Sequence, residues 1–219
     1  MSAKALLVTG ASRGIGRACA LLAGRNGWAV GVNYREDAKA ADAVVETIAK
    51  GGGRSVALKG NIAVEADVLG MFDAATQALG PLTAVIANAG IVAPTAKLAE
   101  MSVERMRRVF EVNVLGAYLT AREATRRMSK SFGGAGGSIV MMSSAAARLG
   151  SPNLYVDHAG SKGAIDPLTL VSPRNSAPRA SGSTLSALGS STPIFTPAEA
   201  SRTAEAFWRD RPNGAPRHG

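Results

Sequence analysis

The sequence has only one cysteine, Cys19, so the chain cannot form an internal disulfide. Cys19 falls in a segment of helical periodicity, which predicts a buried thiol rather than a reactive one. The sequence also lacks any run of about 18 or more apolar residues, so no transmembrane helix is predicted. The N-terminus begins Met-Ser-Ala-Lys without the segments of a signal peptide, which predicts a cytoplasmic location. No metal site is predicted.

Acidic residues are the minority among the charges, with 16 Asp and Glu against 25 Lys and Arg and a net charge of +9. The excess rises locally over residues 97–130, where Glu104, Glu111 and Glu123 are interleaved at helical distances. This pattern predicts a solvated helix face. Because no recognition motif accompanies the charge, we do not predict nucleic acid as a partner, although a basic interaction protein stays an alternative.

Short apolar runs of strand length alternate with segments of helical periodicity over most of the chain. The alternation predicts an α/β fold with a Rossmann-type, doubly wound parallel sheet that is covered on both faces. The expected strands are Ala5–Thr9, Ala29–Asn33, Ser55–Leu58, Ala84–Ala87 and Ser138–Met142. The expected helices are 15–25, 38–50, 65–79, Ser102–Lys130 with Ser102 as the N-cap, and 159–170.

The character of the chain changes after Leu170. Residues 171–203 are rich in serine and proline and have no clear period, so no central strand is expected there. A short helix over Glu199–Arg209 is the one element expected in this region. The sequence therefore predicts a dinucleotide-binding domain over residues 1–170 and an irregular tail over residues 171–219.

A glycine-rich loop, Thr9-Gly-Ala-Ser-Arg-Gly-Ile-Gly16, connects the first expected strand to the first expected helix. Glycines let the backbone turn sharply and approach a pyrophosphate, and the helix N-terminus offers free N–H groups to it. The strand–loop–helix context is the one that such a glycine pattern requires. The residues predicted to bind the dinucleotide here are Gly10, Ser12, Arg13, Gly14, Ile15 and Gly16.

The end of the second strand indicates which cofactor is preferred. An acidic residue at this place binds the ribose 2′-hydroxyl of NAD, whereas this chain reads Asn33-Tyr34-Arg35. We expect Tyr34, Arg35 and Arg13 to lie around a 2′-phosphate, which favours NADP(H) over NAD. The alternative is that both arginines are ordinary exposed residues.

From Lys4 to Leu170 the chain resembles the short-chain dehydrogenase/reductase (SDR) family of the classical type. Its glycine loop resembles the family's TGxxxGIG motif, and Ser143-Ser144 closes the fifth strand. Further resemblances are Asn88-Ala89-Gly90 to the NNAG motif, Asn113 to the helix asparagine, Ser161-Lys162-Gly163-Ala164 to the SKxA motif, and Gly60-Asn61-Ile62 to the adenine-contacting segment, with Asn61 in place of aspartate.

The resemblance implies hydride transfer between a nicotinamide and the carbonyl or alcohol carbon of a small molecule. Ser144 falls at the position of the serine that holds the substrate oxygen, and Asn113 at that of the residue supporting the proton relay. Lys162 falls at the lysine that binds the nicotinamide ribose and lowers the pKa of a catalytic tyrosine. Asn61, Ile62, Asn88, Ala89 and Gly90 are implied cofactor contacts, and an intact fold is implied to form homo-oligomers.

The position of the family's tyrosine, four residues before Lys162, holds His158 in this chain. A histidine can transfer a proton near neutral pH, but its imidazole is shorter than a phenol. Tyr155 lies two helical turns before Lys162 and is not expected to substitute. We therefore hypothesise that carbonyl reduction is severely impaired. The alternative to an active oxidoreductase is a catalytically inactive remnant with at most weak dinucleotide binding.

The segment after Leu170 also departs from the family, yet the expected continuation is recovered in another reading frame. Codons that start at the third base of each codon from Val171 to Thr192 permit LAKEFGAPGIRVNAVRPGIIDT, which resembles the family's next segment. Loss of one base near the Leu170 and Val171 codons would explain this, so residues 171–219 are hypothesised to be a frameshift product. A genuine serine- and proline-rich tail is the alternative.

The frameshift has a consequence for the sheet. By resemblance the strands would follow the order 3-2-1-4-5-6-7, and the last two strands would be missing. Ser138–Met142 would then be an unprotected, apolar edge strand, which invites aggregation.

Overall fold

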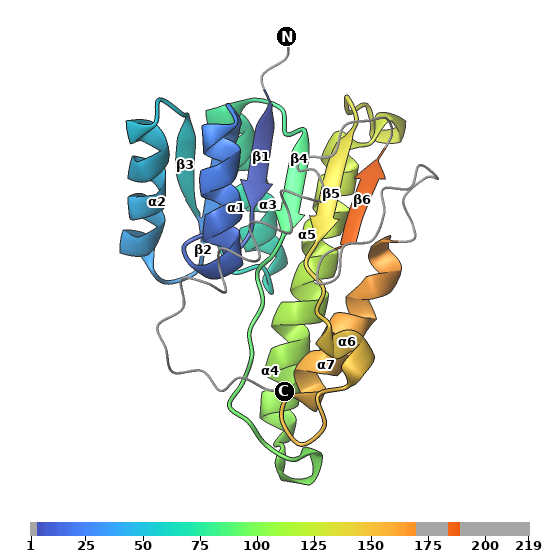
Figure 1. The fold of residues 1–219 in the computed structure, drawn as a ribbon. Coiled ribbons are helices and arrows are strands. Elements are labelled where there is room, and N and C mark those ends of the chain that lie inside the picture. The colour runs from blue at the N-terminus through green and yellow to red at the C-terminus, as the bar shows by residue number, and fades with distance from the viewer. Residues whose placement is uncertain (1–3, 170–183, 189–219) are drawn as a thin grey trace.

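A computed structural model describes residues 4–169 and 184–188 of the 219-residue chain. These residues form a six-stranded sheet in the order β3-β2-β1-β4-β5-β6 (Figure 1). The parallel strands are β1 (Ala5–Val8), β2 (Ala29–Tyr34), β3 (Ser55–Lys59), β4 (Ala84–Ala87) and β5 (Gly137–Met141). The Rossmann-type parallel sheet predicted from the sequence is thereby confirmed.

Helices cover both faces of this sheet (Figure 1). Leu6 of β1 packs in one apolar cluster with α1 and α2, whereas Leu7 packs in another with Phe72 of α3. Successive side chains of a strand point to opposite faces, so a strand that is apolar throughout needs a helix layer on each side. The covering helices are α1 (Gly14–Arg25) and α2 (Ala38–Lys50) on one face, and α3 (Glu65–Leu79) and α5 (Gly116–Met128) on the other.

The segment expected as one long helix over Ser102–Lys130 is helical but is interrupted. It consists of α4 (Val103–Phe110), the π-helical turn η2 (Glu111–Leu115) and α5, and the Ser102 hydroxyl caps its start at 3.2 Å from Arg105 N. A π-turn is one extra residue within a helix and often lies at a functional site. Here it contains Asn113.

The prediction of a solvated helix face over residues 97–130 is wrong for one of its residues. Glu123 of α5 is buried, and its carboxylate accepts a hydrogen bond from Arg127 Nε at 2.6 Å. The charges interleaved at helical spacing did not indicate that Glu123 would be buried on α5, where it pairs with Arg127. Cys19 is buried, as predicted, and burial raises the pKa of its thiol to about 11, which disfavours the reactive thiolate.

The helix α7 (Val156–Ile165) packs against α4. The remaining short helices are η1 (Leu98–Glu100), η3 (Lys130–Phe132), α6 (Ala146–Leu149) and η4 (Asp166–Thr169). The helix expected from residue 159 thus begins earlier and ends earlier. Pro167 lacks an amide hydrogen and disfavours the α conformation before it, so the α-helix changes to a 3-10 turn there.

β6 (Thr184–Leu188) pairs antiparallel with β5, with Ser138 opposite Ala187 and Val140 opposite Leu185. The expectation of an unprotected edge at Ser138–Met142 is therefore wrong, because a strand from the tail covers the β5 backbone. Among the described strands β6 lies at the edge of the sheet, and it runs against the direction of the parallel strands expected from the family's order. The expected helix Glu199–Arg209 lies outside the described residues. Within the described part of the chain, the helices are too short or too polar to span a membrane.

Candidate functional site

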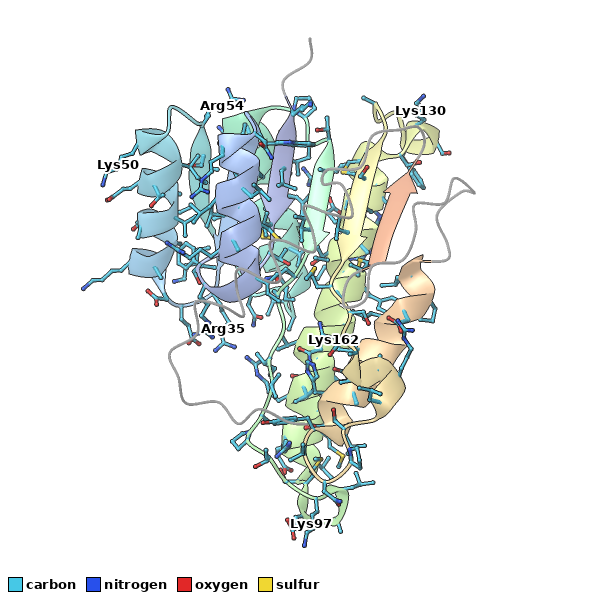
Figure 2. All side chains as sticks on the ribbon, viewed as in Figure 1. Arg35, Lys50, Arg54, Lys97, Lys130 and Lys162 are labelled. Atoms are coloured by element: carbon cyan, nitrogen blue, oxygen red, sulfur yellow. The ribbon has the colours of Figure 1, made fainter. Side chains whose placement is uncertain are left out.

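A cleft of about 770 Å³ opens where the parallel strands end. In an open α/β sheet, ligands bind in this crevice, outside the carboxyl ends of the strands. Figure 2 shows Arg35 and Lys162 at this end of the sheet, whereas Arg54 and Lys130 lie at the opposite end. The predicted site residues that line the cleft are Gly10, Ser12, Arg13, Gly14, Ile15, Tyr34, Arg35, Asn61, Ile62, Asn88, Ala89, Gly90, Ser144, His158 and Lys162.

Two of the predicted site residues, Gly16 and Asn113, do not line the cleft but contact residues that do. Gly16 contributes no lining surface, but a Cβ on it would lie 2.5 Å from Gly10 O and would also collide with the Asn88 amide. Gly10 has φ +63°, and a Cβ there would lie 2.9 Å from Ala89 Cα. The glycines are therefore needed to let the loop, α1 and the end of β4 approach one another. Asn113, the second residue outside the lining, contacts His158 from η2.

Polar side chains hold the glycine loop against the neighbouring strands. Asn88 Nδ2 donates to Thr9 O at 2.8 Å, and the Thr9 hydroxyl accepts from the amides of Asn88 and Ala89 at 3.0 Å each. Asn33 Oδ1 accepts from Gly10 N at 3.0 Å, and its Nδ2 donates to Leu58 O and Gly60 O at 3.1 Å. Sequence reasoning assigned no role to Thr9 or Asn33. The available signal was a single polar residue at the end of each apolar strand.

The start of α1 fits a phosphate group. The Arg13 side chain makes no capping hydrogen bond, and the first turn contains no acidic residue. The positive end of the helix therefore faces the cleft without a carboxylate to neutralise it. Gly10 and Gly16 leave no room for a Cβ, so the backbone can approach a ligand closely. This backbone and the positive helix end suit the pyrophosphate of a dinucleotide.

The residues after β2 carry both signs of charge. Arg35 forms an ion pair with Glu36, and Asp37 caps α2 by accepting from Ala40 N at 2.9 Å. The Arg35 and Glu36 side chains are 42% and 75% exposed, so solvent screens their attraction and leaves Arg35 able to exchange partners. Neither acidic residue occupies the strand-end position itself.

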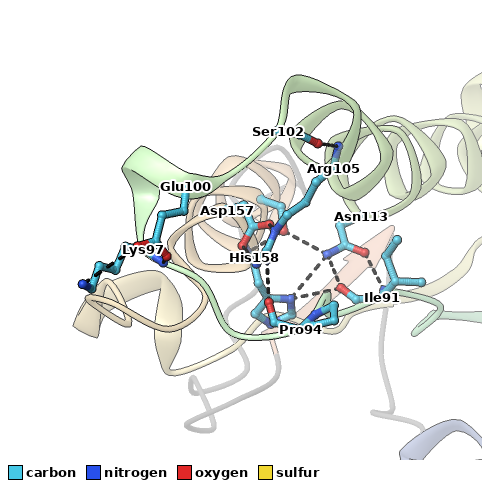
Figure 3. Close-up of polar contacts among 10 residues, drawn as sticks. Ile91, Pro94, Lys97, Glu100, Ser102, Arg105, Asn113, Asp157 and His158 are labelled. Atoms are coloured by element: carbon cyan, nitrogen blue, oxygen red, sulfur yellow. Dashed lines mark hydrogen bonds and ion pairs between the residues drawn. The ribbon is translucent and has the colours of Figure 1, made fainter.

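A hydrogen-bonded cluster joins α7 to η2 and to the loop after β4 (Figure 3). Asn113 Oδ1 accepts from Ile91 N at 2.7 Å, while its Nδ2 donates to Ile91 O at 2.9 Å and to Ser161 Oγ at 3.0 Å. His158 Nδ1 lies 3.3 Å from Ile91 O and 3.4 Å from Asn113 Nδ2. The contacts with Ile91 and Ser161 were not predicted from the sequence, because neither a backbone carbonyl nor the burial of a serine hydroxyl can be recognised from a sequence pattern.

Lys162 is buried beside this cluster, and its ammonium donates to Met142 O at 2.7 Å. Burial lowers the pKa of Lys162 to about 8, although the nearby Asp166 carboxylate opposes the shift. Ser144 Oγ accepts from Ala146 N at 3.2 Å, and Ser143 Oγ donates to Asp166 at 2.6 Å. The structure thus brings Ser144, His158 and Lys162 into one cleft, and Tyr155 precedes α7 as its N-cap.

We expect Lys162 to make stability rise with pH. The unfolded chain holds the lysine proton up to about 10.5, whereas the folded chain loses it near 8, so between these values the unfolded chain binds more protons. The free energy of unfolding of wild type relative to Lys162→Met should increase over this range by at most about 3 kcal/mol. Denaturant titrations at several pH values measure it, and a flat difference would contradict the burial of this charge.

A buried ion pair fixes the start of α7. Arg105 Nε donates to Asp157 Oδ2 at 2.8 Å, Nη2 to Oδ1 at 3.3 Å, and Nη1 to Pro94 O at 2.5 Å (Figure 3). Burial raises the pKa of Asp157, but the Arg105 hydrogen bond and the amide of His158 outweigh it, so this pKa lies below its ordinary value. The Asp157 carboxylate also accepts from His158 N at 2.9 Å. The pair therefore positions His158 relative to the loop after β4.

We expect Asp157→Asn to lower the melting temperature by roughly 5 °C, because it leaves a guanidinium without its buried partner. Asp73→Asn is the matched control. Asp73 also accepts from an arginine at 2.8 Å, but its side chain is 71% exposed, against 1% for Asp157. Calorimetry should show little change for the control. Equal shifts for the two variants would show that burial of the Arg105 pair is irrelevant.

The comparisons with known proteins agree with one another. A family model described as short chain dehydrogenase matches residues 4–180. The "Uncharacterized oxidoreductase YgfF" of Escherichia coli is 48% identical over 163 residues, which cover 74% of this chain and 66% of that protein. The tetrahydroxynaphthalene reductase of Pyricularia oryzae is 35% identical over 166 residues, which cover 76% of this chain and 56% of that protein.

A solved structure gives the same result. The crystal structure of a short-chain type dehydrogenase/reductase from Mycobacterium marinum matches with a TM-score of 0.71 and 34% identity, over 76% of this chain and 66% of that one. The matched part of the chain thus spans about two thirds or less of the length of these relatives.

Proposed function

This chain belongs to the short chain dehydrogenase family, and we propose that it is an NADP(H)-binding oxidoreductase that acts on a carbonyl or alcohol group of a small molecule. The observation that carries this proposal is the arrangement of the cleft. The glycine loop and the unneutralised start of α1 open into the same space as Lys162 and His158. Binding groups for a dinucleotide and a proton-transferring side chain therefore share one site.

Each part of the cleft has a role in holding the cofactor. The start of α1 would bind the pyrophosphate, and Arg13 and Arg35 would bind the 2′-phosphate. Asn61 and Ile62 line the cleft near β3 and would contact the adenine, while Lys162 would donate to the nicotinamide ribose. When bound, the nicotinamide supplies or accepts the hydride. Ser144 would then hold the substrate oxygen, and His158 would exchange its proton.

Cofactor preference tests the proposal. We expect NADPH to bind more tightly than NADH by on the order of tenfold, about 1.4 kcal/mol, because the 2′-phosphate attracts Arg13 and Arg35. Arg35→Gln should remove most of this difference. Arg25→Gln, which changes an exposed arginine at the far end of α1, is the matched control and should preserve it. Equal affinities for the two cofactors in wild type would contradict a 2′-phosphate site at Arg13 and Arg35, and tighter binding of NADH would assign the chain to NAD.

We also propose that residues 171–219 arise from a one-base frameshift and that the uninterrupted frame encodes the rest of the enzyme. The support is the family-like continuation in the shifted frame together with the length comparison, in which the relatives extend beyond the matched region. A carbonyl panel that includes a polyhydroxynaphthalene, after the name of one relative, would measure turnover. By the same proposal the chain acts in the cytoplasm, and an intact chain self-associates.

A further inference from the structure

The hydrogen bonds around Asn113 determine which nitrogen of His158 carries its proton. A side-chain amide has two N–H groups. Those of Asn113 are used at 2.9 Å by Ile91 O and at 3.0 Å by Ser161 Oγ. The amide cannot be turned round, because Oδ1 is held by Ile91 N at 2.7 Å. Asn113 therefore has no hydrogen left for His158 Nδ1, which lies further away at 3.4 Å.

The second neighbour of Nδ1 is an acceptor. Ile91 O lies 3.3 Å from it, and a carbonyl oxygen has two lone pairs, one for Asn113 and one for the ring. Nδ1 therefore has to be the protonated nitrogen. The Ser161 hydroxyl gives its own hydrogen to His158 O at 2.7 Å, so it accepts from Asn113 and cannot release that amide.

The other ring nitrogen, Nε2, has no hydrogen-bond partner among the residues that the structure describes, and His158 lines the cleft. No buried side-chain nitrogen or oxygen of the described residues lacks a partner, so Nε2 is open to the cleft rather than sealed off. A neutral imidazole protonated at Nδ1 presents a bare lone pair at Nε2. This nitrogen accepts a proton and has none to give.

We infer that His158 is fixed as the Nδ1–H tautomer and that its bare Nε2 is the proton acceptor in the oxidation of a secondary alcohol, whereas reduction of a ketone requires the imidazolium form of the ring. This inference rests on the proposed function. In the step, the alcohol O–H bond breaks and its proton goes to Nε2, while the carbinol C–H bond breaks and its hydride goes to the oxidised nicotinamide. A C=O bond forms, and the imidazolium returns its proton to solvent.

The charges around the ring agree with this assignment. Burial and the neighbouring Lys162 lower the pKa of His158, while the Ile91 carbonyl and Asp157 oppose them less strongly. The Asp157 carboxylate is itself paired with Arg105, a charged side chain of α4 that contacts α7. The imidazolium that a ketone reduction would need as proton donor is therefore disfavoured at neutral pH.

Nitrogen NMR of the free chain tests the tautomer directly. The chain has two histidines, so His218→Gln leaves His158 as the single imidazole signal. We expect Nδ1 to show the shift of a protonated ring nitrogen and Nε2 that of a bare one. Ser161→Ala frees one Asn113 hydrogen for Nδ1 and should move population towards the Nε2–H form, whereas Ser131→Ala on the exposed turn η3 should not. A wild-type ring protonated at Nε2 would overturn the inference.

Kinetics supply the second measurement. With NADP⁺ and a panel of secondary alcohols, oxidation should rise with pH as the imidazole loses its proton, and ketone reduction with NADPH should fall over the same range. Above neutral pH we expect kcat/KM for ketone reduction to fall by about tenfold per pH unit, because the imidazolium is lost, whereas kcat/KM for alcohol oxidation should level off. Reduction that stays fast above neutral pH would contradict the inference. Absence of NADPH binding would instead contradict the proposed function. The tautomer is measured without cofactor, so the two failures can be distinguished.

Discussion

Replacing His158 by tyrosine should raise NADPH-dependent carbonyl reduction by about 100-fold or more, the usual contribution of a placed general acid. The Nδ1–H imidazole has no proton at Nε2 to donate, whereas a neutral phenol always has one. A tyrosine four residues before Lys162 would also lie on the same helix face as this buried amine, whose charge lowers a phenol pKa. Steady-state kcat/KM with NADPH and a carbonyl panel measures the change.

The control for this variant is His218→Tyr, which adds the same phenol at the other histidine of the sequence and should leave turnover unchanged. His158→Gln should remain as slow as wild type in reduction, because an amide at this position is no acid. Equal kcat/KM for wild type and His158→Tyr would show that the ring is not the limiting proton donor. The second departure from the family, in the tail, would then be the cause of weak reduction.

The substitution Gly16→Ala should weaken NADPH binding by on the order of 100-fold, about 2.7 kcal/mol. The added Cβ would stand 2.5 Å from Gly10 O and against the Asn88 amide, so the glycine loop must move away from β4. A displacement of about 1 Å can cost two orders of magnitude where groups must meet a ligand in one geometry. Fluorescence titration with NADPH measures the dissociation constant.

Gly70→Ala is the matched control for Gly16→Ala. Gly70 lies within α3, where a Cβ would meet nothing within 4 Å, and alanine favours a helix over glycine by about 1 kcal/mol. This variant should therefore bind NADPH as wild type does and melt at the same or a higher temperature. If Gly16→Ala bound equally well, the loop would not be the phosphate site.

Elements with a strong period were predictable from the sequence, and long-range polar contacts were not. The strand Ala84–Ala87 and the helices Ala38–Lys50 and Glu65–Leu79 were expected with the bounds that the structure has. The Arg105–Asp157 pair was missed because its members are 52 residues apart and each resembles an ordinary charge on a solvated helix. Its energy comes from burial, which depends on how α4 and α7 pack.

The strand β6 was also not predictable from the sequence. Thr184–Leu188 lies in a serine- and proline-rich segment without a strand pattern, yet it pairs with the free side of β5. An edge strand offers unpaired N–H and C=O groups to any extended segment nearby, so backbone pairing alone accounts for it. The π-turn at Asn113 was likewise invisible, because the periodicity of Ser102–Lys130 continues through it.

Resequencing the gene from the Ser144 codon past the stop codon tests the frameshift. One additional base near the Leu170 codon would restore the family-like continuation, and the corrected chain should reduce carbonyls, above all with tyrosine at position 158. An unchanged sequence would establish residues 171–219 as a genuine tail and leave dinucleotide binding as the property to examine.

Titration of the whole 219-residue chain with NADPH is the most direct single measurement of the proposed function. We predict saturable binding at one NADPH per chain, weaker for NADH and strongly reduced by Gly16→Ala. A chain that is folded by circular dichroism and shows no saturable NADPH binding would contradict the assignment of this cleft to a nicotinamide dinucleotide.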